Sequence, residues 1–387
     1  MPSTTVSGGR RLSSLGQPHS APVRGSADRR PLKRYSGAVT ETPSDVGPHR
    51  PATLSDVAHR AGVSQPTASR VLNGSERKVA ESYRKRVLDA ARELGYSPNL
   101  AAQAVARGTS RTVALVISGI SDPYFSAMSA AIMRQAEAVD LRVSIAVTDR
   151  RIDRELELVR ELRGQQPRAI ILAGTGYVDP PSGDQLVDEL RRYEQTGGRV
   201  VLISRSDLPF ETVSFDNREG ARQLARELAA LGYRRCLVLG SGTPLVAMQQ
   251  RVDGFVAGLV EAGVPKAATL VHHPDFSWEG ARSFILGLDE ASLRALDLVF
   301  AITDDMALGA LAGLRERGLS IPQDIGVAGF DDITTLRDIV PPLTTVHVAL
   351  DAVAEEAITR ATATTGEISR RTVPAYPVIR ASTPARP

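Results

Sequence analysis

The chain has 387 residues, of which 42% are hydrophobic and 24% charged. Because one domain usually holds about 100 to 200 residues, this length predicts two or three domains, and the hydrophobic content excludes a chain disordered throughout. The net charge is +3, but residues 1–110 hold 17 Lys and Arg against 8 Asp and Glu, whereas the remainder holds 30 against 36. The basic amino-terminal part is therefore the candidate partner of a polyanion such as nucleic acid.

Cysteine content and hydropathy indicate the cellular compartment in which we expect the protein. Cys236 is the only cysteine, which excludes a disulfide framework and a Cys-rich zinc site, and its apolar surroundings indicate a buried residue in a reducing compartment. No segment approaches the roughly 18 apolar residues of a membrane span, and the amino terminus lacks the apolar core of a secretory signal. We expect a cytoplasmic protein that needs no metal or other cofactor.

Residues 1–50 are rich in Ser, Arg, Pro and Gly and show no apolar periodicity, which predicts a disordered basic extension. Transit peptides have a similar composition. A start assigned too far upstream is the preferred interpretation.

Residues 51–97 predict three short helices. Thr53 can cap the first helix, which Gly62 ends, and Ser64 can cap the second. The third helix is basic and ends at Gly95. Its predicted apolar face holds Tyr83, Val87, Leu88, Ala91 and Leu94. This arrangement is typical of a helix-turn-helix whose second helix enters the major groove of DNA, and a three-helix module of another purpose is the alternative.

From Arg111 onward, short β-branched segments alternate with helical periodicity. The predicted buried strands are 112–118, 142–147, 169–172, 199–203, 235–239, 298–302 and 325–330. The clearest predicted helices between them are 130–139, 154–162, 221–231 and 306–317. Repeated strand–helix–strand units require parallel sheets with helices on both faces, and this length suffices for two such sheets.

The segment TLSDVAHRAGVSQPTASRVLN at residues 53–73 resembles the DNA-binding head of the lactose/galactose repressor family. Further matches follow in the family's order: GYSPN at 95–99, DPYF at 122–125, DDMALG at 304–309, GFDD at 329–332 and PLTT at 342–345. The resemblance covers residues 52 to about 383. It implies an all-α helix-turn-helix head with a hinge helix, followed by an α/β core resembling periplasmic binding proteins, with two doubly wound parallel-sheet lobes.

The domain boundaries that we expect follow from this resemblance. The head spans residues 51–97, the hinge helix and linker 98–110, and the effector-binding and dimerisation domain 111–387. We expect the first lobe to hold about 111–215 plus 346–370, and the second about 216–345 plus 371–384.

The resemblance also implies a homodimer, or a pair of dimers forming a tetramer, on a pseudo-palindromic operator. The implied DNA-contacting residues are Thr53, Ser64, Gln65, Pro66, Thr67, Ser69, Arg70, Asn73, Asn99 and Val105. Arg70 is the strongest candidate for reading a base, because its guanidinium can bond guanine through two hydrogen bonds. Val105 stands where the family usually wedges Leu into the minor groove, so a shallower bend is expected. A linker helix without contact to DNA is the alternative.

The effector would lie between the lobes. By family position, the implied contacts are Asp122, Tyr124, Phe125, Arg205, Arg251, Phe276, Thr303 and Asp331. Several of these residues directly follow predicted strands, and ligands of open α/β sheets bind beyond the carboxyl ends of the strands. The chain departs from the sugar binders of the family at Asp122, Ser204, Thr303 and Val348. Some of the acidic residues, Asp304 and Asp331 among them, could instead be helix caps, and Arg205 a surface ion-pair residue.

We therefore expect a DNA-binding transcriptional repressor controlled by a carbohydrate, and a purine-like or other planar metabolite is the alternative effector. An enzyme is disfavoured because no residue set for catalysis is present: Gly240-Ser-Gly242 lacks the third glycine of a dinucleotide loop, and neither a Walker sequence nor a Gly-x-Ser-x-Gly elbow occurs. A secreted sugar-binding protein is disfavoured by the predicted head.

Overall fold

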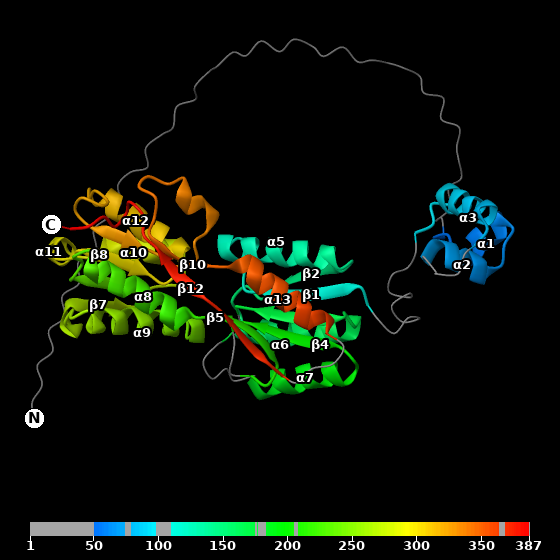
Figure 1. Cartoon of the computed structure of the whole chain (residues 1–387), viewed down its shortest axis with the longest axis horizontal. Coiled ribbons are helices and arrows are strands. Elements are labelled where there is room, and N and C mark those ends of the chain that lie inside the picture. Colours follow the sequence, from blue (N-terminus) through cyan, green and yellow to red (C-terminus); the bar gives the residue numbers. More distant parts are fainter. Residues whose placement is uncertain are drawn as a thin grey trace, which may run out of the picture. The chain divides into compact units, whose positions relative to one another are not determined.

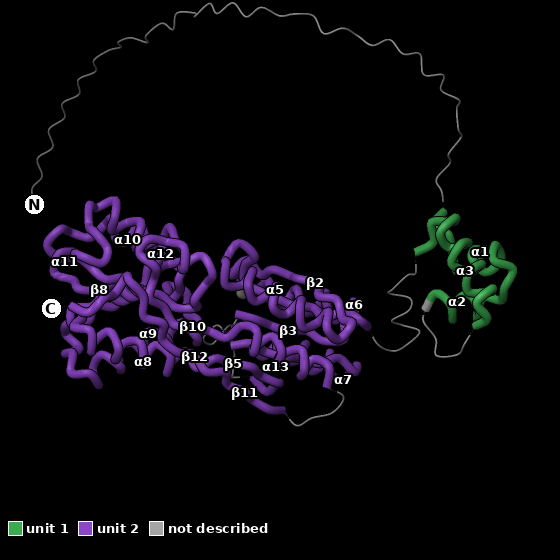
Figure 2. The backbone as a smooth tube through the Cα atoms, turned by 45° about the horizontal axis from the view of Figure 1, so that its top comes forward, with its two compact units in different colours: residues 1–97 green, residues 98–387 purple. Residues whose placement is uncertain are grey.

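The computed structural model describes residues 50–73, 79–97, 110–174, 176, 183–204, 208–363 and 368–386. The chain divides into two compact units, residues 1–97 and residues 98–387, which Figure 2 colours separately. Each unit has its own hydrophobic core, as expected of independent domains.

The smaller unit contains three helices: α1 (Leu54–Ala61), α2 (Gln65–Asn73) and α3 (Glu81–Glu93). Thr53 and Asp56 form a reciprocal capping box at the start of α1, and Gly62 ends this helix with a left-handed φ of 61°. At the start of α2, the Thr67 amide donates to Ser64 Oγ over 3.4 Å. The helix starts and stops predicted from these residues are therefore confirmed.

The predicted apolar face of the third helix is partly wrong. The stripe of α3 that packs on the other two helices contains Val87, Ala90 and Ala91, all buried. Tyr83, Leu88 and Leu94 are 46%, 38% and 38% exposed. Because α1 and α2 are short, they cover only a narrow stripe of α3, and small side chains at that stripe allow close approach.

The first lobe of the larger unit is a six-stranded sheet in the order β11-β5-β4-β3-β1-β2, with every neighbouring pair parallel. Its strands are β1 (Thr112–Ile117), β2 (Arg142–Val147), β3 (Ala169–Ala173), β4 (Arg199–Ile203), β5 (Glu211–Phe215) and β11 (Arg370–Val373). Its helices are α5 (Pro123–Ala138), α6 (Ile152–Gln165), α7 (Gly183–Gln195) and α13 (Leu350–Thr362).

Helices cover both faces of this sheet (Figure 1). Along β1, Val113 and Leu115 belong to the core cluster that includes residues of α5 and α13, whereas Ala114 and Val116 belong to the cluster of α6 and α7. Alternation of side chains in a strand thus places apolar residues on both faces, which explains why the strand is a continuous apolar run.

The second lobe is a four-stranded parallel sheet in the order β7-β6-β8-β9. Its strands are β6 (Cys236–Leu239), β7 (Thr269–His272), β8 (Leu298–Ala301) and β9 (Gly326–Ala328). Its helices are α8 (Asn217–Ala230), α9 (Val246–Glu261), α10 (Trp278–Gly287), α11 (Glu290–Arg294), α12 (Asp304–Glu316) and the short 3-10 helices η1 (Lys266–Ala268) and η2 (Thr334–Arg337). Cys236 is buried, as predicted. The predicted fold class, a helical head followed in the chain by two α/β lobes with parallel sheets, is confirmed.

The chain crosses between the lobes three times. After β5 it enters the second lobe, and it returns through β10 (Thr345–Val348), which pairs antiparallel with β12 (Ala375–Val378). Strand β11 pairs with β5 of the first sheet, so the last crossing follows Val373. The predicted boundary is therefore wrong for residues 371–373, because a parallel edge strand had not been expected there. Residues 346–348 likewise pair with β12 and not with the first sheet.

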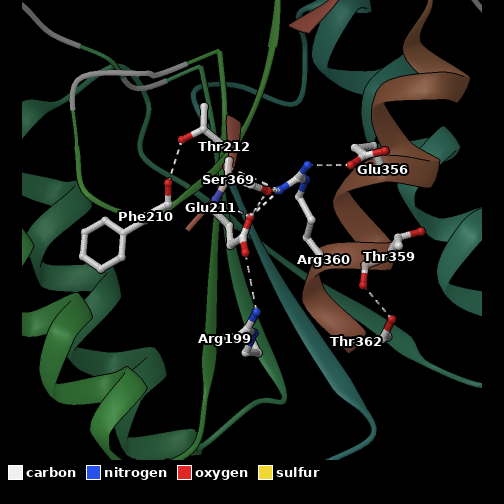
Figure 3. A network of polar contacts seen from close by, with 9 residues as sticks. All are labelled: Arg199, Phe210, Glu211, Thr212, Glu356, Thr359, Arg360, Thr362 and Ser369. Carbon is white, nitrogen blue, oxygen red and sulfur yellow. Dashed lines mark hydrogen bonds and ion pairs between the residues drawn. The ribbon is translucent and has the colours of Figure 1, made fainter. Parts of the chain in front are cut away.

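A polar network fixes α13 and the start of β11 to the first sheet (Figure 3). Glu211, only 7% exposed at the start of β5, accepts hydrogen bonds from the amide and hydroxyl of Ser369 over 3.3 and 3.1 Å and pairs with Arg360 of α13. Arg199 Nη2 lies 3.7 Å from the other carboxylate oxygen. The carboxylate of β5 thus holds α13 and the residue before β11, which follow it by 149 and 158 residues in the chain.

Candidate functional site

Helix α2 presents its polar residues to solvent. Gln65, Pro66 and Arg70 are exposed, whereas Ala68 is buried against the other two helices. Ser64 Oγ and Thr67 Oγ1 lie 2.8 Å apart at the amino-terminal end of the helix. An exposed helix with a guanidinium on its outer face has the form required of a helix that enters the major groove.

The remaining predicted DNA contacts divide into two groups. Thr53 serves the capping box of α1, and Ser69 is half-buried in α2. Asn73 is the last residue of α2, but its side chain lies outside the described residues. Asn99, Val105 and the predicted hinge helix also lie outside the described residues.

The larger unit contains a cavity of about 50 Å³ whose lining comes from both lobes. Side chains of the first lobe reach it from the carboxyl ends of β1, β2, β4 and β5 and from the start of α5. Side chains of the second lobe reach it from α9, from the loops before α9, α10 and α12, and from the segment after β9. The lining residues are Ser118, Asp122, Tyr124, Phe125, Arg150, Gly174, Gly176, Ser204, Phe215, Thr243, Leu245, Ala247, Met248, Arg251, Phe276, Thr303 and Asp331. This is the edge of the sheets at which ligands of α/β proteins bind.

Arg251 is a fully buried arginine at the cavity and is held from several sides. Its Nε donates to Asn217 Oδ1 over 2.8 Å, and its Nη1 donates to the Ile302 carbonyl over 2.7 Å. The guanidinium carbon lies 3.8 Å from the ring centroid of Phe330. Such contacts fix one orientation of the guanidinium before any ligand binds.

Asp331 is the buried partner of Arg251, with 2.9 Å between its Oδ1 and Arg251 Nη1. Its φ of 118° is unusual for a residue with a side chain, and such strain is typical of functional sites. Burial raises the pKa of Asp331 to about 7, although the Arg251 charge opposes the rise. Despite the ion pair, no described residue donates a geometrically acceptable hydrogen bond to Oδ1. Oδ1 nevertheless lies in the ion pair with Arg251, so a ligand would donate to the remaining lone pairs of the carboxylate.

Aromatic rings form the wall of the cavity in the first lobe. Tyr124 packs edge-on against Phe125, with 5.1 Å between ring centroids, and against Phe215, with 6.3 Å. Burial raises the pKa of Tyr124 well above its ordinary value, so its hydroxyl keeps its proton and can donate a hydrogen bond.

Asp122 and Thr303 each cap a helix as well as line the cavity. The Tyr124 amide donates to Asp122 Oδ1 over 3.0 Å, and the Met306 amide donates to Thr303 Oγ1 over 3.3 Å. Burial raises the pKa of Asp122. A capping side chain is held in one rotamer, which makes its remaining polar atoms well-placed ligand contacts.

Asp304 is a structural residue, although it lies beside the cavity. It is fully buried, accepts from the Thr345 hydroxyl over 2.6 Å and accepts from the Ile333 amide over 3.0 Å. Burial and the Asp331 charge raise its pKa well above the ordinary value. These bonds connect α12 to β10 and to the residue before η2.

Seven of the eight predicted effector contacts line the cavity, and Arg205 lies outside the described residues. Among the four departures from the family pattern, Ser204 lines the cavity, but Val348 is buried in β10 away from it. Arg150 was not predicted. It follows β2, so the rule that ligands bind beyond the carboxyl ends of strands could have identified it.

Among the described helices, none is long and apolar enough to cross a membrane. Among the residues that the structure describes, no group of three or more His, Cys, Asp or Glu side chains could hold a metal ion.

Two protein-family descriptions match the chain. Residues 53–99 match "Bacterial regulatory proteins, lacI family", and residues 225–383 match "Periplasmic binding protein-like domain". The first match coincides with the helical head, and the second with most of the second lobe and the returning segments.

Characterised relatives cover most of the chain. The HTH-type transcriptional regulator CelR of Thermobifida fusca is 32% identical over 319 residues, which are 79% of this chain and 90% of the relative. The HTH-type transcriptional regulator GalS of Salmonella typhimurium is 33% identical over 305 residues, which are 78% and 87% of the two chains.

Solved structures agree with this relationship. A CelR–cellobiose complex superimposes with a TM-score of 0.60 at 29% identity, over 86% of this chain and 99% of the other. A lac repressor dimer bound to operator and an anti-inducer gives a TM-score of 0.74 at 24% identity over 87% of this chain and all of the other, a likeness that concerns the fold alone.

Proposed function

Because this chain belongs to the lacI family of bacterial regulatory proteins, we propose that it is a transcriptional repressor whose operator binding is controlled by a sugar held between its two lobes. The observation that carries the sugar assignment is the pair Arg251–Asp331 at the cavity, because it presents a fixed donor and a buried acceptor side by side. Neutral ligands rich in hydroxyl groups use both.

The rest of the lining supports a sugar. The faces of Tyr124 and Phe276 can cover the C–H surface of a pyranose, and Asp122 and Thr303 add polar groups around it. The solved complex of the relative CelR contains cellobiose, a sugar. A cavity of about 50 Å³ has room for only one or two water molecules, so a sugar would require lining side chains to move aside.

A purine-like or other planar metabolite is the second candidate. The observation that favours it is the apolar lining, with Phe125, Phe215, Leu245 and Met248 facing the cavity.

Ligand-induced thermal stabilisation separates these candidates. The wild-type protein, Asp331→Ala and the control Asp351→Ala, which changes an exposed carboxylate of α13, would be screened against sugars, sugar phosphates and nucleobases. We expect a sugar to stabilise the wild type and the control but not Asp331→Ala, because only the last loses the buried acceptor. Stabilisation by nucleobases alone would contradict the sugar assignment, and a sugar response retained by Asp331→Ala would contradict the proposed site.

The proposed DNA partner is a pseudo-palindromic operator bound in the bacterial cytoplasm by a homodimer, or by a tetramer made of two dimers. Two-fold symmetry of the protein should be mirrored in two half-sites, each contacted by one copy of α2. Selection of bound duplexes from a random pool would test this proposal. We expect an inverted repeat, and recovery of asymmetric or unrelated sequences would contradict it.

The proposed role of Val105 in the hinge requires its own test. Val105→Leu should bend the operator at least as strongly as the wild type, whereas Val105→Gly should lose both bending and affinity, since the wedge is removed. Equal bend angles in all three proteins would remove Val105 from the mechanism.

A further inference from the structure

Arg150 connects the two lobes at the cavity. It lies in the first lobe, two residues after Thr148 at the end of β2, and its backbone has a left-handed φ of 58°. This conformation is uncommon for a residue with a side chain. The turn aims the side chain into the cavity, which it lines.

The guanidinium of Arg150 uses different atoms for the two lobes. On the second lobe, Nη1 donates to the Phe276 carbonyl, and the guanidinium carbon lies 4.6 Å from the centroid of the Phe276 ring. On the first lobe, Nη2 lies 3.4 Å from Asp122 Oδ2. One planar group therefore joins the loop before α10 to the start of α5.

The environment strengthens these contacts. The side chains of Arg150 and Asp122 are 35% and 15% exposed, so water screens their attraction less than at an open surface. A guanidinium over an aromatic face is also held more strongly when it is partly desolvated. The negative charge of Asp305, at the start of α12, attracts Arg150 and repels Asp122.

We propose that Arg150 is a positioning residue that holds the two lobes together across the cavity and so preorganises the site for the effector. Each ligand that binds the closed lobes then spends less of its binding energy on closing them. The effector part of this inference rests on the proposed function, but the closure itself can be measured without any sugar.

The chain provides a matched control and an intrinsic probe. The neighbouring Arg151 is exposed, and its Nη2 lies 2.6 Å from Asp153 Oδ2 within the same lobe, so its removal leaves the bridge intact. Trp278 is the only tryptophan of the chain and begins α10, two residues after Phe276. Its fluorescence therefore reports on the segment that carries Phe276.

Acrylamide quenching of Trp278 would be measured in the full-length wild type, Arg150→Ala, Arg150→Lys and Arg151→Ala without added sugar. We expect the quenching constant to rise about twofold in Arg150→Ala, because a loosened contact admits the quencher. The quenching constant of Arg150→Lys should lie between those of the wild type and Arg150→Ala, since lysine keeps the charge and lacks the planar group. Small-angle scattering should show a larger radius of gyration for Arg150→Ala. Arg151→Ala should match the wild type.

Quenching and dimensions in Arg150→Ala that equal those of the wild type would overturn the inference. If Arg150→Ala does not fold, Phe276→Leu removes the ring face while keeping the carbonyl, and it should raise quenching in the same way.

For a sugar that stabilises the wild type, Arg150→Ala should weaken affinity by about fivefold or more and Arg151→Ala should not. Increased quenching with unchanged affinity would overturn the link to the effector, whereas a failure of every sugar on the wild type would count against the proposed function alone.

Discussion

Arg251 Nη1 lies 2.9 Å from Asp331 Oδ1, and the two side chains are 2% and 4% exposed. Burial of both charges at the cavity is costly unless each has several partners, and Arg251 has them in Asn217, Ile302 and Phe330. Asp331 has fewer, and burial raises its pKa to about 7. The site is therefore asymmetric: among the described residues, the cation has several protein partners, whereas the acid is paired with Arg251 alone.

This asymmetry predicts a pH dependence of stability. Because the pKa of Asp331 rises from 3.8 to about 7 on folding, the native protein binds more protons than the unfolded chain between these values. The stabilisation from this proton is fully present below pH 3.8 and is lost as the pH rises through about 7. Asp331→Asn cannot ionise. We expect the melting temperature of the wild type to fall relative to that of Asp331→Asn between about pH 5 and pH 8.5. A difference in melting temperature between the two proteins that does not change with pH would contradict the raised pKa of Asp331.

Glu211 makes a second, stronger test of buried charge. Its removal leaves Arg199 without this carboxylate and Arg360 with Glu356 as its remaining acidic partner, so Glu211→Ala should cost about 3 kcal/mol of stability in the first lobe. The control is Asp351→Ala, which breaks the exposed pair with Arg134 and should cost at most about 1 kcal/mol. Thermal unfolding of the full-length variants measures both. Equal losses would mean that Glu211 is not the main anchor of α13 and β11.

The sequence was sufficient to predict helices and strands where hydrophobic periodicity and the chemistry of neighbouring residues agree. Strands β2 and β4 were predicted at their observed bounds because each is a compact apolar segment between polar residues. The caps of α1 and α2 were predicted because Thr53 and Ser64 need only neighbouring residues to act.

Pairing between segments that are far apart in the chain could not be predicted from the sequence. Strand β11 reads as RRTV, with no apolar alternation, and it is a strand because β5 offers it an open edge. Its position after β2 could have identified Arg150 as a cavity residue, but its contact with Phe276 could not be predicted because Phe276 is 126 residues away in the chain. The predicted effector contacts came from family position, and burial of Asp304 in structural hydrogen bonds became visible only once α12 and β10 were placed together.

Close helix packing in the second lobe predicts an unusual cost for a small substitution. A Cβ at Gly309 of α12 would lie 2.1 Å from the Trp278 carbonyl of α10, so Gly309→Ala must push the two helices apart. We expect a loss of about 1 to 3 kcal/mol in thermal unfolding. At Gly164 of α6 an added Cβ meets nothing within 4 Å, and Gly164→Ala should stabilise by up to about 1 kcal/mol through helix propensity. The same sign for both substitutions would contradict this packing argument.

Base reading by α2 is testable at Arg70, which is exposed near the middle of the helix. If its guanidinium bonds a base edge, Arg70→Ala should cost about 1 to 3 kcal/mol on the selected operator and leave non-specific DNA nearly unaffected. The control is Arg92→Ala on α3, which also removes an exposed positive charge and should change the ratio of the two affinities little. Both affinities would be measured at one fixed salt concentration, since phosphate contacts weaken as salt rises. An equal loss on both DNAs would make Arg70 a phosphate contact, and base recognition would then rest on Gln65 and Pro66.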